Sequence, residues 1–145
     1  MLHEDFKELL ILLEKNEVEY LLVGGYAVSF YGYPRYTGDM DIWYNSNKTN
    51  ALKLLSVLEQ FGFASLNITI KDLTKKNSII QLGYPPIRVD FINNIDGVEF
   101  SKCYKNKLFE DYDGIKIKII NLIDLKTNKK ASGRFRDLDD LEHLT

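Results

Sequence analysis

Hydrophobic residues recur along this chain at two spacings, every three to four residues in some segments and every second residue in others. The longer spacing is typical of helices that bury one face, and the shorter spacing is typical of strands. Helical spacing, together with helix-ending residues, predicts helices over 2–15, 27–31, 49–61, 121–133 and 136–144. Short apolar or alternating runs predict strands over 20–23, 41–44, 66–70, 78–82, 87–92, 108–112 and 115–119.

The order of these elements predicts the fold class. Helices precede, interrupt and follow a mixed set of strands, which is typical of an α+β or α/β domain whose mixed sheet is flanked by helices. Asp113-Gly114 is the dipeptide of a tight hairpin turn between the last two strands. A chain of 145 residues has the size of one ordinary domain, so we expect a single domain over residues 1–145.

Composition narrows the class of protein without identifying a function. Hydrophobic residues make up 45% of the chain, too many for a disordered protein. The formal net charge of −2 gives no overall reason to bind nucleic acid. Cys103 is the lone cysteine, so no disulfide can form within the chain. The sequence shows neither an apolar run of membrane-spanning length nor a secretion signal, and we expect a cytoplasmic protein without membrane contact.

Gly24 and Gly25 directly follow the predicted strand 20–23 and precede a predicted helix. Glycine permits unusual backbone angles and lets a ligand approach the main chain closely. Free N–H groups in the first turn of a helix attract anions, and the helix dipole adds to that attraction. The junction is therefore a candidate phosphate-binding turn, although an ordinary tight turn has the same sequence.

Asp39 and Asp41 stand one residue apart where the next predicted strand begins. Side chains alternate between the two faces of a strand, so both carboxylates project from one face, about 7 Å apart along the backbone. Like charges at this spacing favour a shared cation, and Mg²⁺ binds a few carboxylates while leaving positions for substrate phosphates. The plainer explanation of this pair, taken alone, is a solvated strand end.

A third acid, Asp90, interrupts the otherwise apolar strand 87–92. An acid there is either a hydrogen-bonded polar residue or a further ligand of a two-metal site, in which it acts on the attacking hydroxyl. Together with Asp39 and Asp41, it supplies the number of carboxylates that two-metal phosphoryl chemistry needs. We therefore assign metal binding and catalysis to these three aspartates.

This pattern of glycines and aspartates resembles the polymerase-β-like nucleotidyltransferase superfamily. The matching residues are Gly24-Gly25 after an apolar residue, Asp39-Met40-Asp41, and Asp90 between apolar neighbours. Further positions are similar to the bacterial branch that contains AbiE-type toxin and lincosamide-type antibiotic nucleotidyltransferases: Gly32, Arg35, Thr37, 121–126 and 131–137. The resemblance covers about Leu21 to Leu141. It implies the minimal nucleotidyltransferase fold and transfer of a nucleoside monophosphate from a nucleoside triphosphate (NTP) to an acceptor hydroxyl.

The resemblance also implies roles by position. Gly24 and Gly25 would hold the triphosphate, although many relatives have Ser at the second position. Asp39 and Asp41 would hold two Mg²⁺ ions, with Mn²⁺ as an alternative, and Asp90 would hold the ion on the side of the nucleophile. The further nucleotide-binding candidates are Arg35, Thr37, Lys126 and Arg134. Asp137 and Asp140 would orient the basic side chains among them. The basic run around Lys126 has the plainer explanation of a solvated face.

Functions of different classes remain open. The first is a Mg²⁺-dependent nucleotidyltransferase that acts on a tRNA, a protein or a small molecule, with the toxin of a toxin–antitoxin pair as one biological role. The alternative is a catalytically silent nucleotide-binding or regulatory module of the same fold, such as an antitoxin subunit. A plainer alternative is a structural domain with solvated acids. Because the chain has little beyond a catalytic core, we expect the acceptor to bind across a homodimer or against a partner protein such as an antitoxin.

Overall fold

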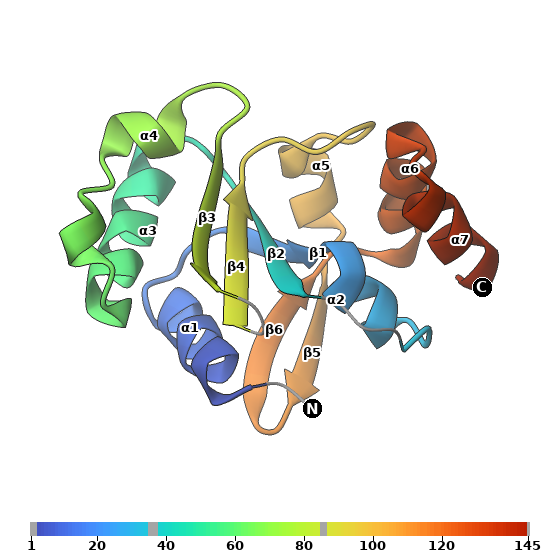
Figure 1. Ribbon diagram of the computed structural model, residues 1–145, viewed down its shortest axis with the longest axis horizontal. Helices are drawn as coiled ribbons and strands as arrows, with labels where there is room; N and C mark the ends of the chain where they lie inside the picture. The colour runs from blue at the N-terminus through green and yellow to red at the C-terminus, as the bar shows by residue number, and fades with distance from the viewer. Residues whose placement is uncertain (1–2, 35–37, 85–86, 145) are drawn as a thin grey trace.

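The computed structural model describes residues 3–34, 38–84 and 87–144. A six-stranded sheet in the order β3-β4-β2-β1-β6-β5 runs through the described part of the chain (Figure 1). Its strands are β1 (Tyr20–Val23), β2 (Asp39–Tyr44), β3 (Ile79–Tyr84), β4 (Ile87–Ile92), β5 (Leu108–Tyr112) and β6 (Ile115–Ile119). The helices are α1 (Glu4–Lys15), α2 (Gly24–Phe30), α3 (Lys48–Phe61), α4 (Ile70–Thr74), α5 (Phe100–Lys105), α6 (Leu122–Ser132) and α7 (Phe135–His143), with the 3₁₀ turn η1 (Ala64–Leu66).

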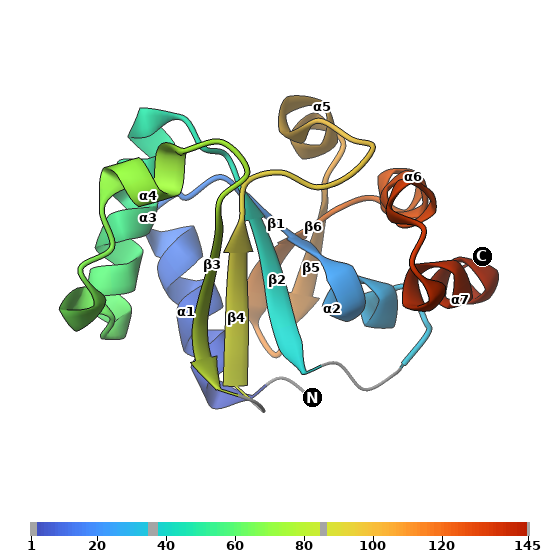
Figure 2. The same ribbon diagram turned by 45° about the horizontal axis from the view of Figure 1, so that its top comes forward.

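Helices flank the sheet on both sides. In both views α1, α3 and α4 lie on one side of the strands, and α6 and α7 lie on the other (Figure 2). The predicted α+β class with a mixed sheet and flanking helices is confirmed. Among the described residues, no helix combines the length and the apolar character needed to cross a membrane.

The parallel pairing of β2 with β4 brings distant parts of the sequence together. Asp41 on β2 is in register with Asp90 on β4, and Asp39 is in register with Arg88. On the other side of β2, β1 runs antiparallel and places Val23 opposite Asp41. Parallel neighbours require a crossover connection, which here contains α3, η1, α4 and β3. The two halves of the acidic pattern therefore meet at one point of the sheet.

Alternation along β2 separates an acidic face from a buried one. Met40 and Ile42 are fully buried, whereas Asp39 and Asp41 are half-buried. Helix α1 buries Leu10 and its neighbours at helical spacing in the same core. Each such side chain contributes roughly 1.5–3 kcal/mol relative to an exposed one. The apolar face thus anchors the strand while the acidic face stays accessible.

The boundaries of several elements differ from the sequence-based predictions. The helix predicted over 27–31 begins earlier, at Gly24, and the strand predicted over 41–44 begins at Asp39. Helix α5 was not predicted at all, because its six residues are too few to show a helical period. Apart from the strand predicted over 66–70, the remaining predicted helices and strands are present within a few residues of their expected ends.

The strand predicted over 66–70 is wrong. Leu66, Ile68 and Ile70 alternate with polar residues and so imitate a strand. Thr69 instead caps α4: its hydroxyl accepts a hydrogen bond from the Asp72 N–H at 3.2 Å, and the Asp72 carboxylate accepts one from the Thr69 N–H at 2.9 Å. This reciprocal pair satisfies two N–H groups and starts a helix where a strand was expected.

Thr69→Ala should lower the free energy of unfolding by about 1 kcal/mol, because it removes the cap of α4. Chemical denaturation of the variant and of the unmodified protein measures this difference. Thr49→Ala is the matched control, since Thr49 is exposed in the first turn of α3, which Asn47 already caps. Equal losses in the two variants would contradict the role of the Thr69–Asp72 pair.

Candidate active site

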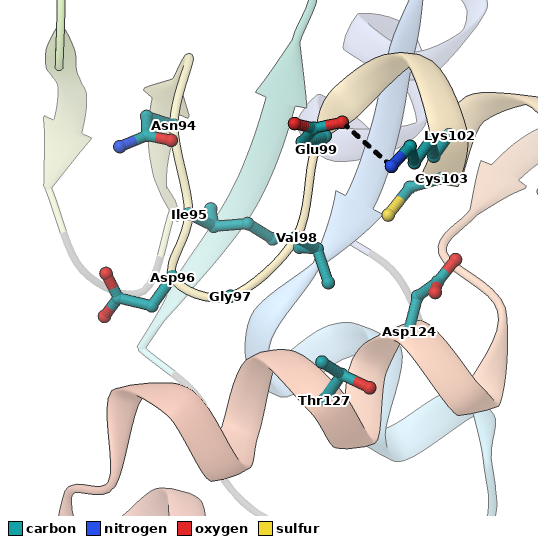
Figure 3. Close-up of a pocket in the computed structure, with 10 residues that line it drawn as sticks. All are labelled: Asn94, Ile95, Asp96, Gly97, Val98, Glu99, Lys102, Cys103, Asp124 and Thr127. Carbon is teal, nitrogen blue, oxygen red and sulfur yellow. Dashed lines mark ion pairs between the residues drawn. The ribbon is translucent and has the colours of Figure 1, made fainter.

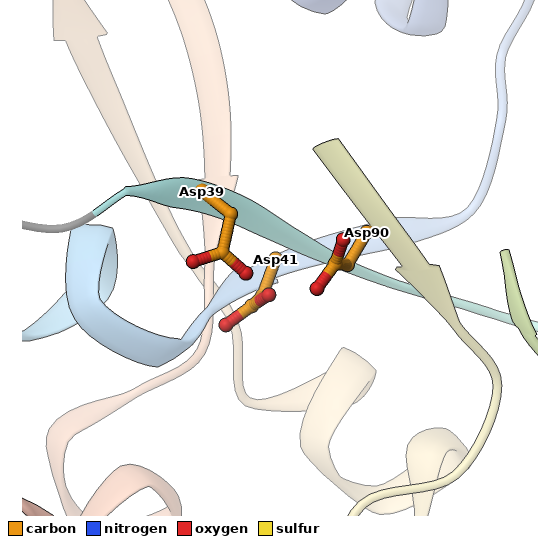
Figure 4. Close-up of side chains that lie close together, drawn as sticks. All are labelled: Asp39, Asp41 and Asp90. Atoms are coloured by element: carbon orange, nitrogen blue, oxygen red, sulfur yellow. The ribbon is translucent and has the colours of Figure 1, made fainter. Parts of the chain in front are cut away.

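The carboxylates of Asp39, Asp41 and Asp90 converge on one face of the sheet (Figure 4). One oxygen from each lies within 4.8 Å of the other two. The register of β2 with β4 places Asp41 beside Asp90, and alternation along β2 places Asp39 on the same face. The structure therefore brings together the three residues to which the sequence assigns metal binding; we call them the acidic triad.

Burial and the crowding of negative charge in the acidic triad raise the pKa of two of its members. Burial, followed by the charges of Asp39 and Asp90, raises the pKa of Asp41 to about 7, and the charge of Lys129 opposes this shift. Burial also raises the pKa of Asp90, against a hydrogen bond from Arg88 that lowers it. A bound divalent cation would remove this repulsion. Three converging carboxylate oxygens at an accessible face fit the oxygen ligands that Mg²⁺ and Mn²⁺ prefer.

Gly24 gives Asp41 the space that it occupies. Gly24 has a φ of +67°, and a Cβ atom at this position would collide with the Asp41 carboxylate. Gly25 is buried in the first turn of α2, and both glycines line the cleft above the acidic triad. The sequence predicted a phosphate-binding turn here; the clearance for Asp41 depends on tertiary packing and carries no local sequence signal.

A cleft of about 810 Å³ lies over the acidic triad, a size typical of ligand sites. Its lining combines the acids with basic residues from other elements: Arg88 on β4, Lys129 on α6, Arg134 before α7, and Arg136 on α7. Acidic and basic groups thus face one cavity. Such a cavity can hold a polyanion against the basic groups and a cation against the acids.

Lys129, and not the predicted Lys126, is the lysine that lines this cleft. Its side chain is almost fully buried, and its Nζ lies 3.2 Å from Asp137 Oδ1 and 3.0 Å from Asp140 Oδ2. Lys126 is half-buried on α6 and is not among the described residues of the cleft lining. The missed signal is spacing: Lys129 follows the buried Leu125 by four residues, which places both on one face of the helix.

Asp137 connects the basic residues of the cleft. Burial alone would raise its pKa, but hydrogen bonds from Ser132 and Arg134 and the charge of Lys129 lower the pKa to about 2. The Ser132 hydroxyl lies 2.7 Å and the Arg134 Nε 2.9 Å from Asp137 Oδ2. An ionised Asp137 therefore forms ion pairs with both Lys129 and Arg134 at the cleft.

Three further positions complete the comparison with the sequence. The candidates Arg35 and Thr37 lie outside the described residues. Arg88, which the sequence analysis did not single out, donates hydrogen bonds to both oxygens of Asp90, from Nε at 3.0 Å and from Nη2 at 3.1 Å. Alternation along the strand could have identified Arg88, because residues two apart on a strand share a face and Asp90 was already a candidate.

A second hollow of about 640 Å³ adjoins the cleft and shares Asn94, Ile95 and Asp96 with it (Figure 3). Cys103 and Asp124 form part of its lining. Burial, followed by the charge of Asp124, raises the pKa of the Cys103 thiol to about 12. The thiol therefore stays protonated at neutral pH and is a poor nucleophile or metal ligand.

Known proteins place the chain in a family. A family described as "nucleotidyl transferase of unknown function" (DUF2204) matches residues 2–145. No curated protein matches. The structure of a "putative nucleotidyltransferase" from Thermotoga maritima covers 95% of this chain and 88% of its own, with a TM-score of 0.65 and 17% identity. The structure of lincomycin-bound lincosamide antibiotic adenylyltransferase LnuA covers 99% of this chain and 96% of its own, with a TM-score of 0.63 and 18% identity. The two structures share the fold, which confirms the predicted nucleotidyltransferase fold.

Gly24→Ala should destabilise the protein more than Gly114→Ala, by about 1–3 kcal/mol. Both glycines have positive φ, at +67° and +79°, so both variants strain the backbone. Only at Gly24 does the added methyl group also collide with Asp41, because no atom lies within 4 Å of a Cβ at Gly114. Denaturant titration of both variants gives the two free energies of unfolding; equal values would show that Gly24 makes no room for Asp41.

Asp41→Asn should raise the free energy of unfolding of the metal-free protein at pH 8 by roughly 1–4 kcal/mol, since one pKa unit corresponds to about 1.4 kcal/mol. The folded-state pKa of Asp41 is raised, so the unfolded chain ionises this group first and stability falls as pH rises from about 4 to about 7. The gain from Asn should therefore grow over this interval and stay level above it.

Thermal unfolding with chelator present, followed from pH 4 to pH 9, measures this gain. Glu8→Gln is the control, because Glu8 is exposed on α1, away from the cleft. A gain for Asp41→Asn that does not depend on pH would show that Asp41 is not crowded by the other two acids.

Proposed function

The chain belongs to the nucleotidyl transferase family DUF2204, and we propose that it is a Mg²⁺-dependent enzyme that transfers a nucleoside monophosphate from an NTP to an acceptor hydroxyl. The observation that carries this proposal is the convergence of Asp39, Asp41 and Asp90 within 4.8 Å on the floor of a cleft with basic walls. Family membership supports the reaction class, and the residues of the cleft support the roles below.

The distribution of charge in the cleft supports an NTP as the substrate. A triphosphate is a polyanion that the acidic triad alone would repel. Lys129 and Arg134, which Asp137 holds in place, offer charge-assisted hydrogen bonds to its oxygens. Gly24 and Gly25 bring the backbone at the start of α2 to the same cleft. The triphosphate would therefore lie between α2 and the wall formed by α6 and α7.

In the proposed reaction, the acceptor oxygen forms a bond to the α-phosphorus and the bond from that phosphorus to pyrophosphate breaks, with loss of the hydroxyl proton to water. Mg²⁺ bound at the acidic triad would supply Lewis-acid stabilisation of the reacting oxygens. Asp39 and Asp41 serve the phosphate side. Asp90, on the neighbouring strand β4, serves the acceptor side. Lys129 and Arg134 neutralise charge on the leaving pyrophosphate.

A small molecule is the first acceptor to test. The hollow beside the cleft shares three residues with it and offers a further volume of about 640 Å³. The structurally similar LnuA acts on a lincosamide antibiotic, as its name states. A tRNA and a protein are the other acceptors; with either of them the enzyme would act as a toxin, and an antitoxin partner would restrain it.

Incubation with each of the four α-labelled NTPs, Mg²⁺ and one acceptor class at a time tests the proposal. We expect label on one acceptor and release of pyrophosphate. Asp90→Asn should reduce transfer at least about a hundredfold, because it removes a charged carboxylate that would hold the ion on the acceptor side. Glu110→Gln, an exposed substitution on β5, is the matched control and should retain full transfer.

Two outcomes would contradict the proposal in different ways. Bound nucleotide with no label on any acceptor would favour the catalytically silent module. Full transfer by Asp90→Asn would show that Asp90 does not act on the acceptor side, while the proposed reaction class would still hold.

A further inference from the structure

Arg88 donates hydrogen bonds to both carboxylate oxygens of Asp90, the third member of the acidic triad. Its Nε lies 3.0 Å from Asp90 Oδ1, and its Nη2 lies 3.1 Å from Asp90 Oδ2. The Asp90 side chain is 10% exposed and that of Arg88 is 32% exposed. A carboxylate that accepts two hydrogen bonds from one guanidinium has its best lone pairs directed at that group. A cation that approaches Asp90 along these same directions therefore displaces at least one of the two hydrogen bonds.

The sheet fixes Arg88 in this position. Residues 88 and 90 share a face of β4, and the register pairs Arg88 with Asp39 and Asp90 with Asp41. The Arg88 guanidinium therefore borders the whole acidic triad, and the charges of Asp39 and Asp41 act on it in addition to that of Asp90. The backbone that places the ligands of the metal thus also places a positive group among them.

The outer end of Arg88 remains accessible, since it lines the cleft. Lys129, in contrast, is almost fully buried between Asp137 and Asp140 and has little room to move. An arginine side chain with one exposed side can leave a partner and remain in the same cleft, at a cost typical of partly exposed ion pairs. Arg88 thus has both the contact and the freedom that an exchange of partners requires.

We propose that Arg88 is an exchangeable counterion of the acidic triad: it holds Asp90 in the metal-free protein and releases Asp90 when a divalent cation enters. This inference rests on the proposed metal-dependent function and adds a positioning residue to it. Arg88 keeps Asp90 in place and partly neutralised before the metal binds. It also lowers metal affinity, because the cation has to displace it. Once released, its guanidinium faces the cleft, where it can bind a phosphate oxygen of the nucleotide.

Mn²⁺ binding without nucleotide, measured by electron paramagnetic resonance at fixed pH and salt, tests this role apart from catalysis. Arg88→Gln should bind Mn²⁺ about two- to fivefold more tightly than the unmodified protein, the range expected for loss of a partly exposed competing ion pair. Arg88→Lys keeps the positive charge but cannot form the two parallel bonds, so its affinity should lie between the two. Arg136→Gln removes another cationic residue of the cleft and should change the affinity less than twofold.

The pattern of results separates exchange from its alternatives. Unchanged or weaker binding by Arg88→Gln would overturn the proposal. Tighter binding by Arg88→Gln with unchanged binding by Arg88→Lys would also overturn it, since general charge repulsion would then explain the effect. Circular dichroism verifies that each variant is folded, and Arg88→Lys preserves the charge balance if Arg88→Gln is unstable.

Asp41→Asn distinguishes this proposal from the function on which it rests. If the unmodified protein binds no Mn²⁺, or if Asp41→Asn binds it equally well, the metal site itself is wrong and both proposals fail. If Asp41→Asn loses binding while Arg88→Gln leaves it unchanged, only the role of Arg88 fails.

Discussion

Repulsion among three carboxylates is the constraint that the rest of the structure has to accommodate. Asp39, Asp41 and Asp90 approach within 4.8 Å, although burial and like charge disfavour the ionised forms of Asp41 and Asp90. Hydrophobic packing beneath β2 and the parallel ladder to β4 offset this cost. The fold therefore stores an unfavourable interaction at one place, as proteins commonly do where a ligand is to bind.

The positive groups around this site are held in two different ways. Lys129 belongs to a buried cluster with Asp137 and Asp140, and its two ion pairs connect α6 to α7. Breaking such a cluster by removing one member leaves an uncompensated buried charge. Arg88 is partly exposed and pairs with a member of the acidic triad itself. Lys129 thus stabilises the wall of the cleft, and Arg88 lies among the acids of the triad.

Local patterns in the sequence were sufficient to predict the fold class and to single out the three acids. Alternation alone places Asp39 beside Asp41, and the interruption of an apolar strand identifies Asp90. Pairings between distant elements were not accessible in this way. The clearance that Gly24 leaves for Asp41 depends on how α2 meets β2, and the presence of Lys129 at the cleft depends on which face α6 turns toward it.

The wrong strand over 66–70 has a different physical origin. Its alternating apolar residues gave a strand pattern, while the side chains of Thr69 and Asp72 satisfied the backbone of a helix start. The capping pair was present in the sequence but was outweighed by periodicity. In a segment this short, two side-chain hydrogen bonds decide the conformation more strongly than three apolar positions do.

The parallel ladder between β2 and β4 also determines when during folding the site can exist. Asp41 and Asp90 are about fifty residues apart, and closing so long a segment costs chain entropy before any contact repays it. During synthesis β2 emerges well before β4, and the cleft wall of α6 and α7 emerges later than both. An incomplete chain therefore carries the acids without the cleft. Ordered binding of a divalent cation would accordingly report that β2 and β4 have paired, which makes the site an internal indicator of this long-range step in folding.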